Sequence, residues 1–227
     1  MPTEIILVKC HYCGLKNRVP SEADRNSVIC GACRSMVFGP HKYFVLGCKT
    51  IGLATHQAQL KIVQLAWSIY TEDGGFLDEH MHIIRPEGYS IPSAAAQSHG
   101  ITNALAMERG EDKKSVLLRF MGSVKSHRVR FVAHDLPFTG AAVTAGLKSI
   151  GEQFNMDDFA SFCTMLATTQ LCGIPGRFGK PRWPTLQELH QYLFDGAFEG
   201  GHDALADVKA TAACFFYLKE KQLLPVH

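Results

Sequence analysis

The cysteines of the first forty residues are the side chains best placed for chemistry. Cys10 and Cys13 form one Cys-x-x-Cys pair, and Cys30 and Cys33 form a second, with sixteen residues between the pairs. Tetrahedral zinc needs four soft donors that converge on one point, at about 2.3 Å from each sulfur. Because each pair offers two thiolates from one tight loop, the spacing predicts one structural Zn²⁺ held by these four cysteines.

A redox-active Cys-x-x-Cys is the alternative, but such a motif normally occurs once and within a βαβ context. His11 is not needed as a ligand, since the four-thiolate set is already complete. Residues 8–9, 17–19 and 27–29 are expected to be strands of a small antiparallel sheet, so residues 1–40 resemble a zinc ribbon. A module this small buries little core, and metal must supply much of its folding free energy. A ribbon could contact nucleic acid, dock a protein or serve as a structural cap, and all three options stay open.

A second group of candidate residues lies in the loop 176–183, which mixes cations with aromatic side chains. Its cations are Arg177, Lys180 and Arg182, and its aromatic residues are Phe178 and Trp183. Such a mixture can follow the backbone of a single nucleic-acid strand and stack its bases. Equally, Trp183 could pack in the core while the charges solvate the loop.

The elements that must position such residues follow from hydrophobic periodicity after the Gly39-Pro40 boundary. Residues 43–48, an alternating and therefore half-buried run at 61–70, and residues 76–84 predict an antiparallel meander with a turn at 73–75. A further buried strand is expected at 129–133. Helices are expected after Pro92 and at 113–124, 139–150 and 204–221, with another opened by a capping box at Thr185. This order predicts an α/β domain with a mixed sheet over residues 41–227.

Four segments in this order resemble the DEDDh-type 3′→5′ exonucleases, the family of the DNA polymerase III epsilon proofreading subunit. Residues 202–211, which begin His202-Asp203-Ala204-Leu205-Ala206-Asp207, match the third motif of that family, and residues 132–138 match the second up to its last position. Residues 86–102 and 183–189 match two further stretches. The resemblance covers about 180 residues and implies a ribonuclease H-like mixed sheet flanked by helices.

The resemblance also implies a site, because these enzymes hydrolyse phosphodiesters with two divalent metals held by four carboxylates and with a histidine as general base. In this chain Gly47 and Lys49 stand at the two carboxylate positions of the first motif, and Thr139 stands at that of the second. Asp207 and His202 are retained. Three of the four carboxylates are therefore replaced.

The negative charge of one carboxylate does not balance two dications. Lys49 adds another positive charge, and repulsion between like charges about 4 Å apart costs several kcal/mol. Neither Asp135 nor Asp203 is expected to reach the pocket. We therefore expect neither Mg²⁺ nor Mn²⁺ there, and instead an ion pair between Lys49 and Asp207. That pair either keeps the fold neutral or lets Lys49 bind a phosphate.

The leading hypothesis is a catalytically inactive nuclease-fold protein that binds single-stranded DNA or RNA, or a protein partner through the ribbon. An exonuclease with residual or atypical metal use and a purely structural subunit of a larger assembly are the alternatives. The net charge of +2 favours no partner class. Residues 1–8 do not resemble a signal peptide and no run of 18 apolar residues occurs, so a cytoplasmic location without a membrane partner is expected. DNA or RNA preference and oligomeric state stay open.

Overall fold

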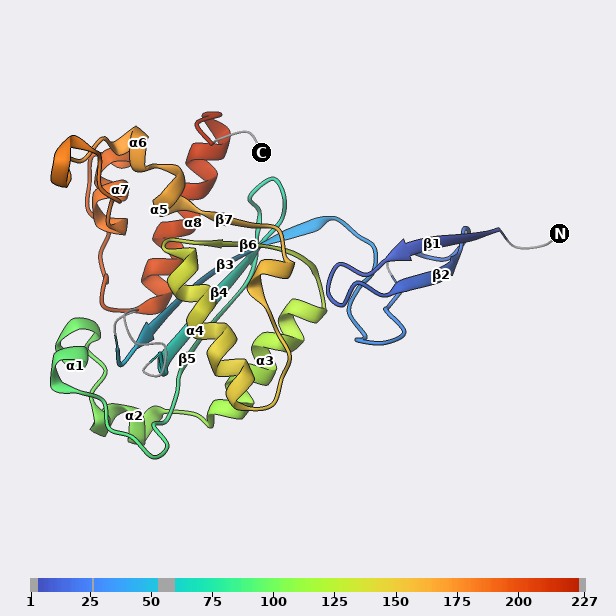
Figure 1. Ribbon diagram of the computed structural model, residues 1–227, viewed down its shortest axis with the longest axis horizontal. Coiled ribbons are helices and arrows are strands. Elements are labelled where there is room, and N and C mark those ends of the chain that lie inside the picture. The colour runs from blue at the N-terminus through green and yellow to red at the C-terminus, as the bar shows by residue number, and fades with distance from the viewer. Residues whose placement is uncertain (1–3, 26, 53–59, 225–227) are drawn as a thin grey trace.

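A computed structural model describes residues 4–25, 27–52 and 60–224. Figure 1 shows a small N-terminal arm, here called the ribbon (residues up to 40), that projects from a larger α/β body. In the ribbon, β1 (Ile5–Lys9) pairs antiparallel with β2 (Lys16–Pro20). The expected third strand at 27–29 is reduced to one bridge between Ile29 and Met36. The chain turns immediately afterwards to form the second cysteine pair, which leaves no length for a strand.

The body is built on a five-stranded sheet in the order β5-β4-β3-β6-β7. Strands β3 (His41–Thr50), β4 (Ile62–Tyr70) and β5 (Phe76–Ile83) form the predicted antiparallel meander. Strand β6 (Arg128–Ala133) then runs parallel to β3, and the short edge strand β7 (Ser161–Cys163) runs parallel to β6. The sheet is therefore mixed, as expected.

Helices cover both faces of this sheet (Figure 1). The helices α3 (Lys113–Lys125) and α4 (Leu136–Ser149) pack on one face around buried aromatic side chains such as Phe44 and Phe131. Helix α8 (Ala204–Glu220) packs on the opposite face against Val45 and Val132. A further helix, α7 (Leu186–Phe194), lies beside α8 and begins with the predicted capping box at Thr185.

Strand β4 departs from the expected half-buried pattern. The alternating residues Val63, Leu65, Trp67 and Ile69 are buried, but so are the residues between them, including Gln64. The reason is that β4 lies inside the sheet with helices on both sides. The alternating pattern thus correctly predicted a strand, but the prediction that one face of the strand is exposed to solvent was wrong.

Two predicted helices are present, one of them with a different start, and several further short elements were not predicted. Helix α1 (Ser93–His99) is the short helix predicted after Pro92, and helix α4 begins three residues earlier than predicted because Asp135 caps it. The unpredicted elements are α2 (Asn103–Arg109), β7, α5 (Thr164–Ala167), α6 (Thr169–Cys172) and the 3-10 helices Met156–Asp158 and Arg177–Gly179. Elements this short contain too few turns for a periodic signal.

The ribbon is joined to the body by contacts of the two residues that follow Cys10 and of Met36, which follows the second cysteine pair. The Tyr12 ring packs edge-on against Phe159 with 5.6 Å between ring centroids. The Nε2 atom of His11 lies 3.1 Å from the carbonyl oxygen of His127, and the Met36 amide donates to the carbonyl of Lys125 at 2.9 Å. These contacts hold the ribbon at the end of the sheet where β3 begins.

Candidate functional site

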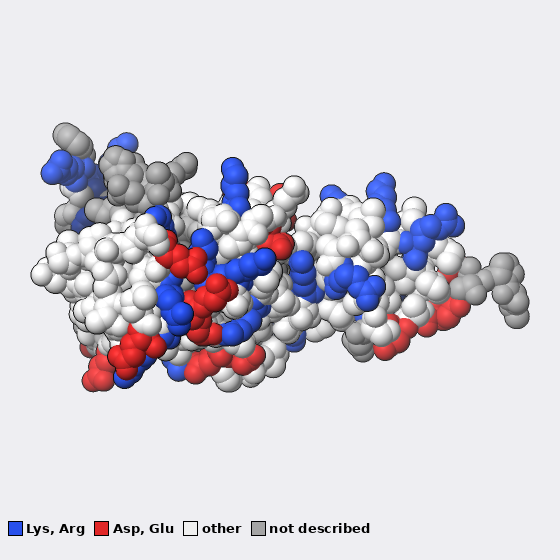
Figure 2. Space-filling model, turned by 90° about the horizontal axis from the view of Figure 1, so that it is seen from below, with Lys and Arg blue, Asp and Glu red and all other residues white. Residues whose placement is uncertain are grey.

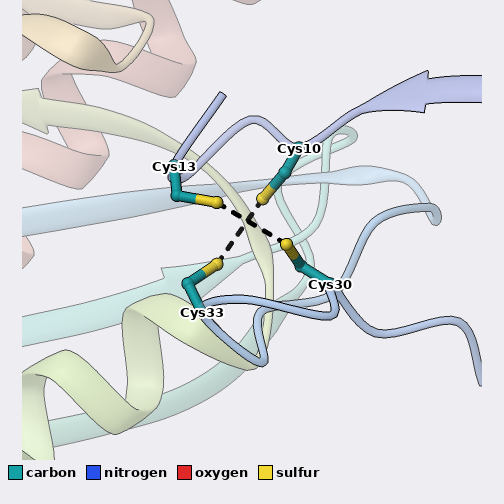
Figure 3. A group of neighbouring side chains, drawn as sticks. All are labelled: Cys10, Cys13, Cys30 and Cys33. Atoms are coloured by element: carbon teal, nitrogen blue, oxygen red, sulfur yellow. Dashed lines mark hydrogen bonds between the residues drawn. The ribbon is translucent and has the colours of Figure 1, made fainter. Parts of the chain in front are cut away.

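The four ribbon cysteines converge on one point (Figure 3). Their sulfur atoms all lie within 4.8 Å of one another, with Cys10 and Cys33 at 3.6 Å and Cys13 and Cys30 at 3.5 Å. Sulfurs at about 2.3 Å from a tetrahedral zinc would be separated by about 3.8 Å. The cluster therefore has the size and donor set of a metal site. Within the described residues it is the one group of three or more His, Cys, Asp or Glu side chains so arranged.

Polar groups lie within hydrogen-bond distance of the sulfurs of the cluster. Ser35, which is fully buried, places its hydroxyl oxygen 3.1 Å from the sulfurs of both Cys10 and Cys33. The Asn17 amide lies 3.6 Å from the sulfur of Cys30. Desolvation raises the pKa of the Cys30 thiol, but hydrogen bonds from backbone amides and neighbouring side chains outweigh it and lower that pKa to about 6, whereas desolvation and the neighbouring cysteines raise the pKa of Cys13 to about 12. Such donors favour thiolates, the form that binds metal.

Sequence reasoning missed Ser35 and Asn17 as parts of this site. Ser35 comes two residues after Cys33, so a polar residue just beyond a cysteine pair was an available signal. Asn17 carried no such signal, because only the pairing of β1 with β2 brings it to the second cysteine pair.

The second candidate site is the pocket at the positions implied by the exonuclease resemblance. Gly47 and Lys49 lie two residues apart near the end of β3, Thr139 lies in the first turn of α4, and Asp207 lies in the first turn of α8. Gly47, Thr139 and Asp207 line a pocket of about 110 Å³. Ligand-binding pockets are typically about 300–1,000 Å³, so this one is too small for a nucleotide.

Lys49 and Asp207 form an ion pair in this region. The Lys49 ammonium lies 2.6 Å from Oδ2 of Asp207 and donates a second hydrogen bond of 3.1 Å to the carbonyl of Gly201. Both side chains are largely buried, with 15% and 28% of their surface exposed. Burial raises the pKa of the Asp207 carboxyl, and the Lys49 ammonium opposes that shift. The cation is thus held by two oxygen atoms.

Gly47 allows helix α8 to approach β3 closely. A Cβ atom at this position would lie 3.2 Å from Cγ2 of Val208 and 3.4 Å from the carbonyl oxygen of Ala204. The 3.2 Å separation is tighter than ordinary van der Waals contact, so a side chain at position 47 would require Val208 to move by a few tenths of an ångström.

The other acidic and histidine candidates are engaged elsewhere. His202 is exposed, and its Nδ1 lies 2.6 Å from the carbonyl oxygen of Ser98 rather than on Asp207. Asp203 caps α8 by accepting from the amides of Leu205 and Ala206, and its other oxygen accepts from Gln64. Asp135 accepts from the Phe138 amide and caps α4.

The side chains at this pocket do not fit a pair of divalent ions. The enzymes that this chain resembles are expected to hold their metals with four carboxylates. Here Asp207 supplies one carboxylate, and Lys49 already neutralises it. Mg²⁺ and Mn²⁺ require several oxygen ligands with compensating negative charge.

Sequence analysis missed Gln64, which is buried in β4 and forms hydrogen bonds with the Asp203 carboxylate and the amide of Ala204. A polar residue in an apolar strand was a visible signal for it.

Pro184, the residue that follows the loop 176–183, lies near this pocket, because its carbonyl oxygen is 3.0 Å from Nε2 of His134, which lines the pocket just after β6. Trp183 is 61% exposed, so the alternative that it packs in the core was wrong. Arg182 is held by Glu188, with 2.9 Å between Nη1 and Oε2. Arg177 and Lys180 are exposed; the side chain of Phe178 lies outside the described residues.

No protein-family model matches the chain, and no curated protein matches it. Solved structures do match. The zinc-bound complex of E. coli exonuclease I with single-stranded DNA has a TM-score of 0.65 at 18% identity, covering 81% of this chain and 41% of that one. E. coli exonuclease I with a dT13 oligonucleotide has a TM-score of 0.67 at 18% identity, covering 80% and 42%. This chain thus spans less than half of those chains.

The likeness shows the exonuclease, ribonuclease H-like fold and no more at this level of identity. It agrees with the five-stranded mixed sheet and its flanking helices. Among the residues that the structure describes, none of the helices is long and apolar enough to span a bilayer.

Proposed function

We propose that this chain is a catalytically inactive member of the exonuclease fold that binds single-stranded nucleic acid. The observation that carries the proposal is the ion pair between Lys49 and Asp207, with 2.6 Å between Nζ and Oδ2. A tethered ammonium neutralises the one carboxylate that remains at the family positions. The interaction of a dication with an ammonium about 4 Å away is unfavourable by about 8 kcal/mol at an effective dielectric of 20, and the single carboxylate of Asp207 can at most offset it. Hydrolysis by the two-metal mechanism is therefore not expected.

The binding half of the proposal rests on the exposed loop 176–183. An exposed indole such as Trp183 is a suitable surface for stacking a base, and the exposed Arg177 and Lys180 can contact the flanking phosphates. Arg182 is paired with Glu188, which compensates its charge, so Arg177 and Lys180 are the cations that the loop offers to phosphates. The solved structures of exonuclease I with oligonucleotides support single-stranded DNA as the first ligand to test.

The proposed zinc at the ribbon cysteines is structural. All four donor positions of a tetrahedral ion are filled by thiolates, which leaves no open position for a substrate or a water molecule. In this proposal the ribbon metal takes no part in nucleic-acid chemistry.

The test combines a degradation assay with a binding assay. A 3′-labelled single strand of DNA or RNA is incubated with the protein and Mg²⁺ or Mn²⁺, and stays intact with both the wild type and Asp207→Ala. Fluorescence anisotropy detects binding that weakens with salt. Trp183→Ala weakens it about 10-fold, as expected for one lost stacking contact. The matched control is Phe76→Ala, which removes an equally exposed aromatic side chain, 58% against 61%, from β5.

Two outcomes would contradict the proposal in different ways. A product ladder from the wild type that disappears in Asp207→Ala would reveal an exonuclease with atypical metal use. An intact strand with no salt-dependent binding would favour a structural subunit. Equal losses in Trp183→Ala and Phe76→Ala would remove the role given to the loop.

A further inference from the structure

The ribbon carries a solvent-exposed face that combines cations with aliphatic side chains. In the register of β1 and β2, Leu7 is paired with Arg18 and Lys9 with Lys16, and residues paired directly across two strands share one face. These residues are exposed, and Leu7 has 67% of its surface open to solvent. Ile5 and Pro20 complete the face, which contains no acidic residue.

The cations of this face are not neutralised by the protein. Within residues 4–25, 27–52 and 60–224, Lys9, Lys16 and Arg18 take part in none of the ion pairs. Figure 2 shows that Lys and Arg side chains spread over the ribbon end of the molecule while its acidic side chains gather along one edge. The face is therefore an uncompensated positive surface.

This face and the pocket occupy opposite ends of the molecule. Lys49 lies near the end of β3, whereas the ribbon is joined to the start of β3 at His41 and projects away from the body (Figure 1). The contacts of His11 and Tyr12 hold the ribbon in this orientation. A ligand that contacts both regions must therefore be long. Because the ribbon is already held in place, binding of such a ligand does not require the ribbon to be reoriented.

We propose that the face formed by Leu7, Lys9, Lys16 and Arg18 is a second contact for the same nucleic-acid strand. The inference rests on the proposed single-strand binding at the loop 176–183. The residues Lys16 and Arg18 are about 7 Å apart along β2, which matches about two nucleotides of a stacked strand. A polyanion supplies evenly spaced charges to all three cations, and the exposed aliphatic side chains pack against sugars and bases.

The distance between the two contacts sets a minimum length for the strand. Strand β3 has ten residues and is about 33 Å long. The ribbon projects beyond the start of β3 (Figure 1), so the strand must span more than this length. At the rise of about 3.4 Å per nucleotide of a stacked strand that takes more than about ten nucleotides, and a more extended strand needs fewer. Linking the contacts through one strand makes the second binding event intramolecular, which raises affinity about 100-fold when the length suffices.

The experiment measures anisotropy of labelled oligo-dT of about 6 and about 30 nucleotides with the full-length, zinc-loaded protein. The long strand binds about 100-fold more tightly than the short one. The double variant Lys16→Glu/Arg18→Glu reduces the long-strand affinity to the level of the short strand and leaves the short-strand affinity unchanged. It also reduces the slope of log K against log salt for the long strand by about 1 to 2.

Lys114→Glu is the matched control, because Lys114 is an exposed cation on α3, away from both regions, and it leaves both affinities near wild type. Zinc content of the double variant must equal that of the wild type, which shows that the ribbon is intact. If the long strand gains no affinity over the short one, or if the double variant keeps the gain, the inference is overturned while short-strand binding still supports the proposed function. If neither strand binds, both this inference and the proposed function are contradicted.

Discussion

The four-cysteine cluster and the nuclease-like pocket are both places where a metal would be sought, and they are built in opposite ways. In the ribbon, four thiol groups converge and the surrounding hydroxyl and amide groups lie within hydrogen-bond distance of their sulfurs. In the body, one carboxylate remains and a lysine of the same chain already supplies the cation. One site gathers four sulfur donors that could hold a metal ion, and the other pairs its one carboxylate with a cation of the protein itself.

The difference teaches that the fold around a site does not fix its affinity for metal. The strand, the two helices and the pocket between them persist in the body, yet metal affinity depends on the number and charge of the donors. The ribbon has almost no core apart from a few residues such as Val19 and Val37, so its structure depends on the donors themselves. The predictions below test this contrast, from the largest expected effect to the smallest.

Removing a cysteine ligand should separate the two regions most strongly. Cys30→Ser lowers the zinc content from about one ion per chain to near zero and unfolds the ribbon, since structural zinc supplies about 10–16 kcal/mol of apparent binding free energy. Elemental mass spectrometry and amide hydrogen exchange should show loss of protection in the ribbon with the body preserved. Cys172→Ser, outside the cluster, is the control. Wild-type zinc content in Cys30→Ser would refute the assignment.

Returning carboxylates to the pocket should make it resemble the ribbon in metal affinity. Lys49→Glu/Thr139→Asp places two new carboxylates beside Asp207, and we expect Mn²⁺ to bind with a Kd near 1 mM, about 4 kcal/mol. Gly47 is left unchanged because a Cβ there would meet Val208 at 3.2 Å. Titration followed by electron paramagnetic resonance measures the binding, and adding Asp207→Asn abolishes it. Equal Mn²⁺ binding by the wild-type pocket would defeat the charge argument.

Breaking the ion pair should destabilise the body. Removing one partner of a buried pair costs about 3–5 kcal/mol, and the partial exposure of Lys49 and Asp207 reduces the expected cost of Lys49→Met to about 2 kcal/mol. The pKa of the Asp207 carboxyl, already raised by burial, should rise further once the ammonium is gone. Urea denaturation and NMR titration measure these effects. Lys49→Met/Asp207→Asn should recover at least half of the loss; a double variant as unstable as the single one would contradict the pairing.

A solvent-exposed ion pair provides the reference for the pocket. Hydrogen bonds from Arg182, followed by the backbone amide of Thr185, lower the pKa of Glu188 from 4.5 to about 2. Because the folded-state pKa is depressed, this stabilisation is present above about pH 4.5 and is lost as the pH falls towards 2. Glu188→Gln should cost about 1 kcal/mol or less at pH 7, since the pair is exposed, and clearly less near pH 2, where about half of the carboxyl groups are protonated. Thermal melts across this range test it; a pH-independent difference would show that charge is not the cause.

Much of the fold was readable from local patterns. The meander, the long helix α8 and the capping box at Thr185 follow from periodicity, turn residues and spacing, which act over a few neighbouring residues. The missed elements α5 and α6 have four residues each, too short to show a period. Burial of both faces of β4 was not readable, because it depends on α8 packing from far along the chain.

The sequence by itself determined which donors exist: four cysteines in two pairs, one aspartate, and a lysine where a carboxylate would be expected. Tertiary structure alone decided what those side chains touch. It brought Lys49 to Asp207 across 158 residues, placed His202 on the carbonyl of Ser98, and left Trp183 in solvent. The physical reason is that residue type sets charge and ligand chemistry locally, whereas pairing and burial depend on packing between segments distant in the chain.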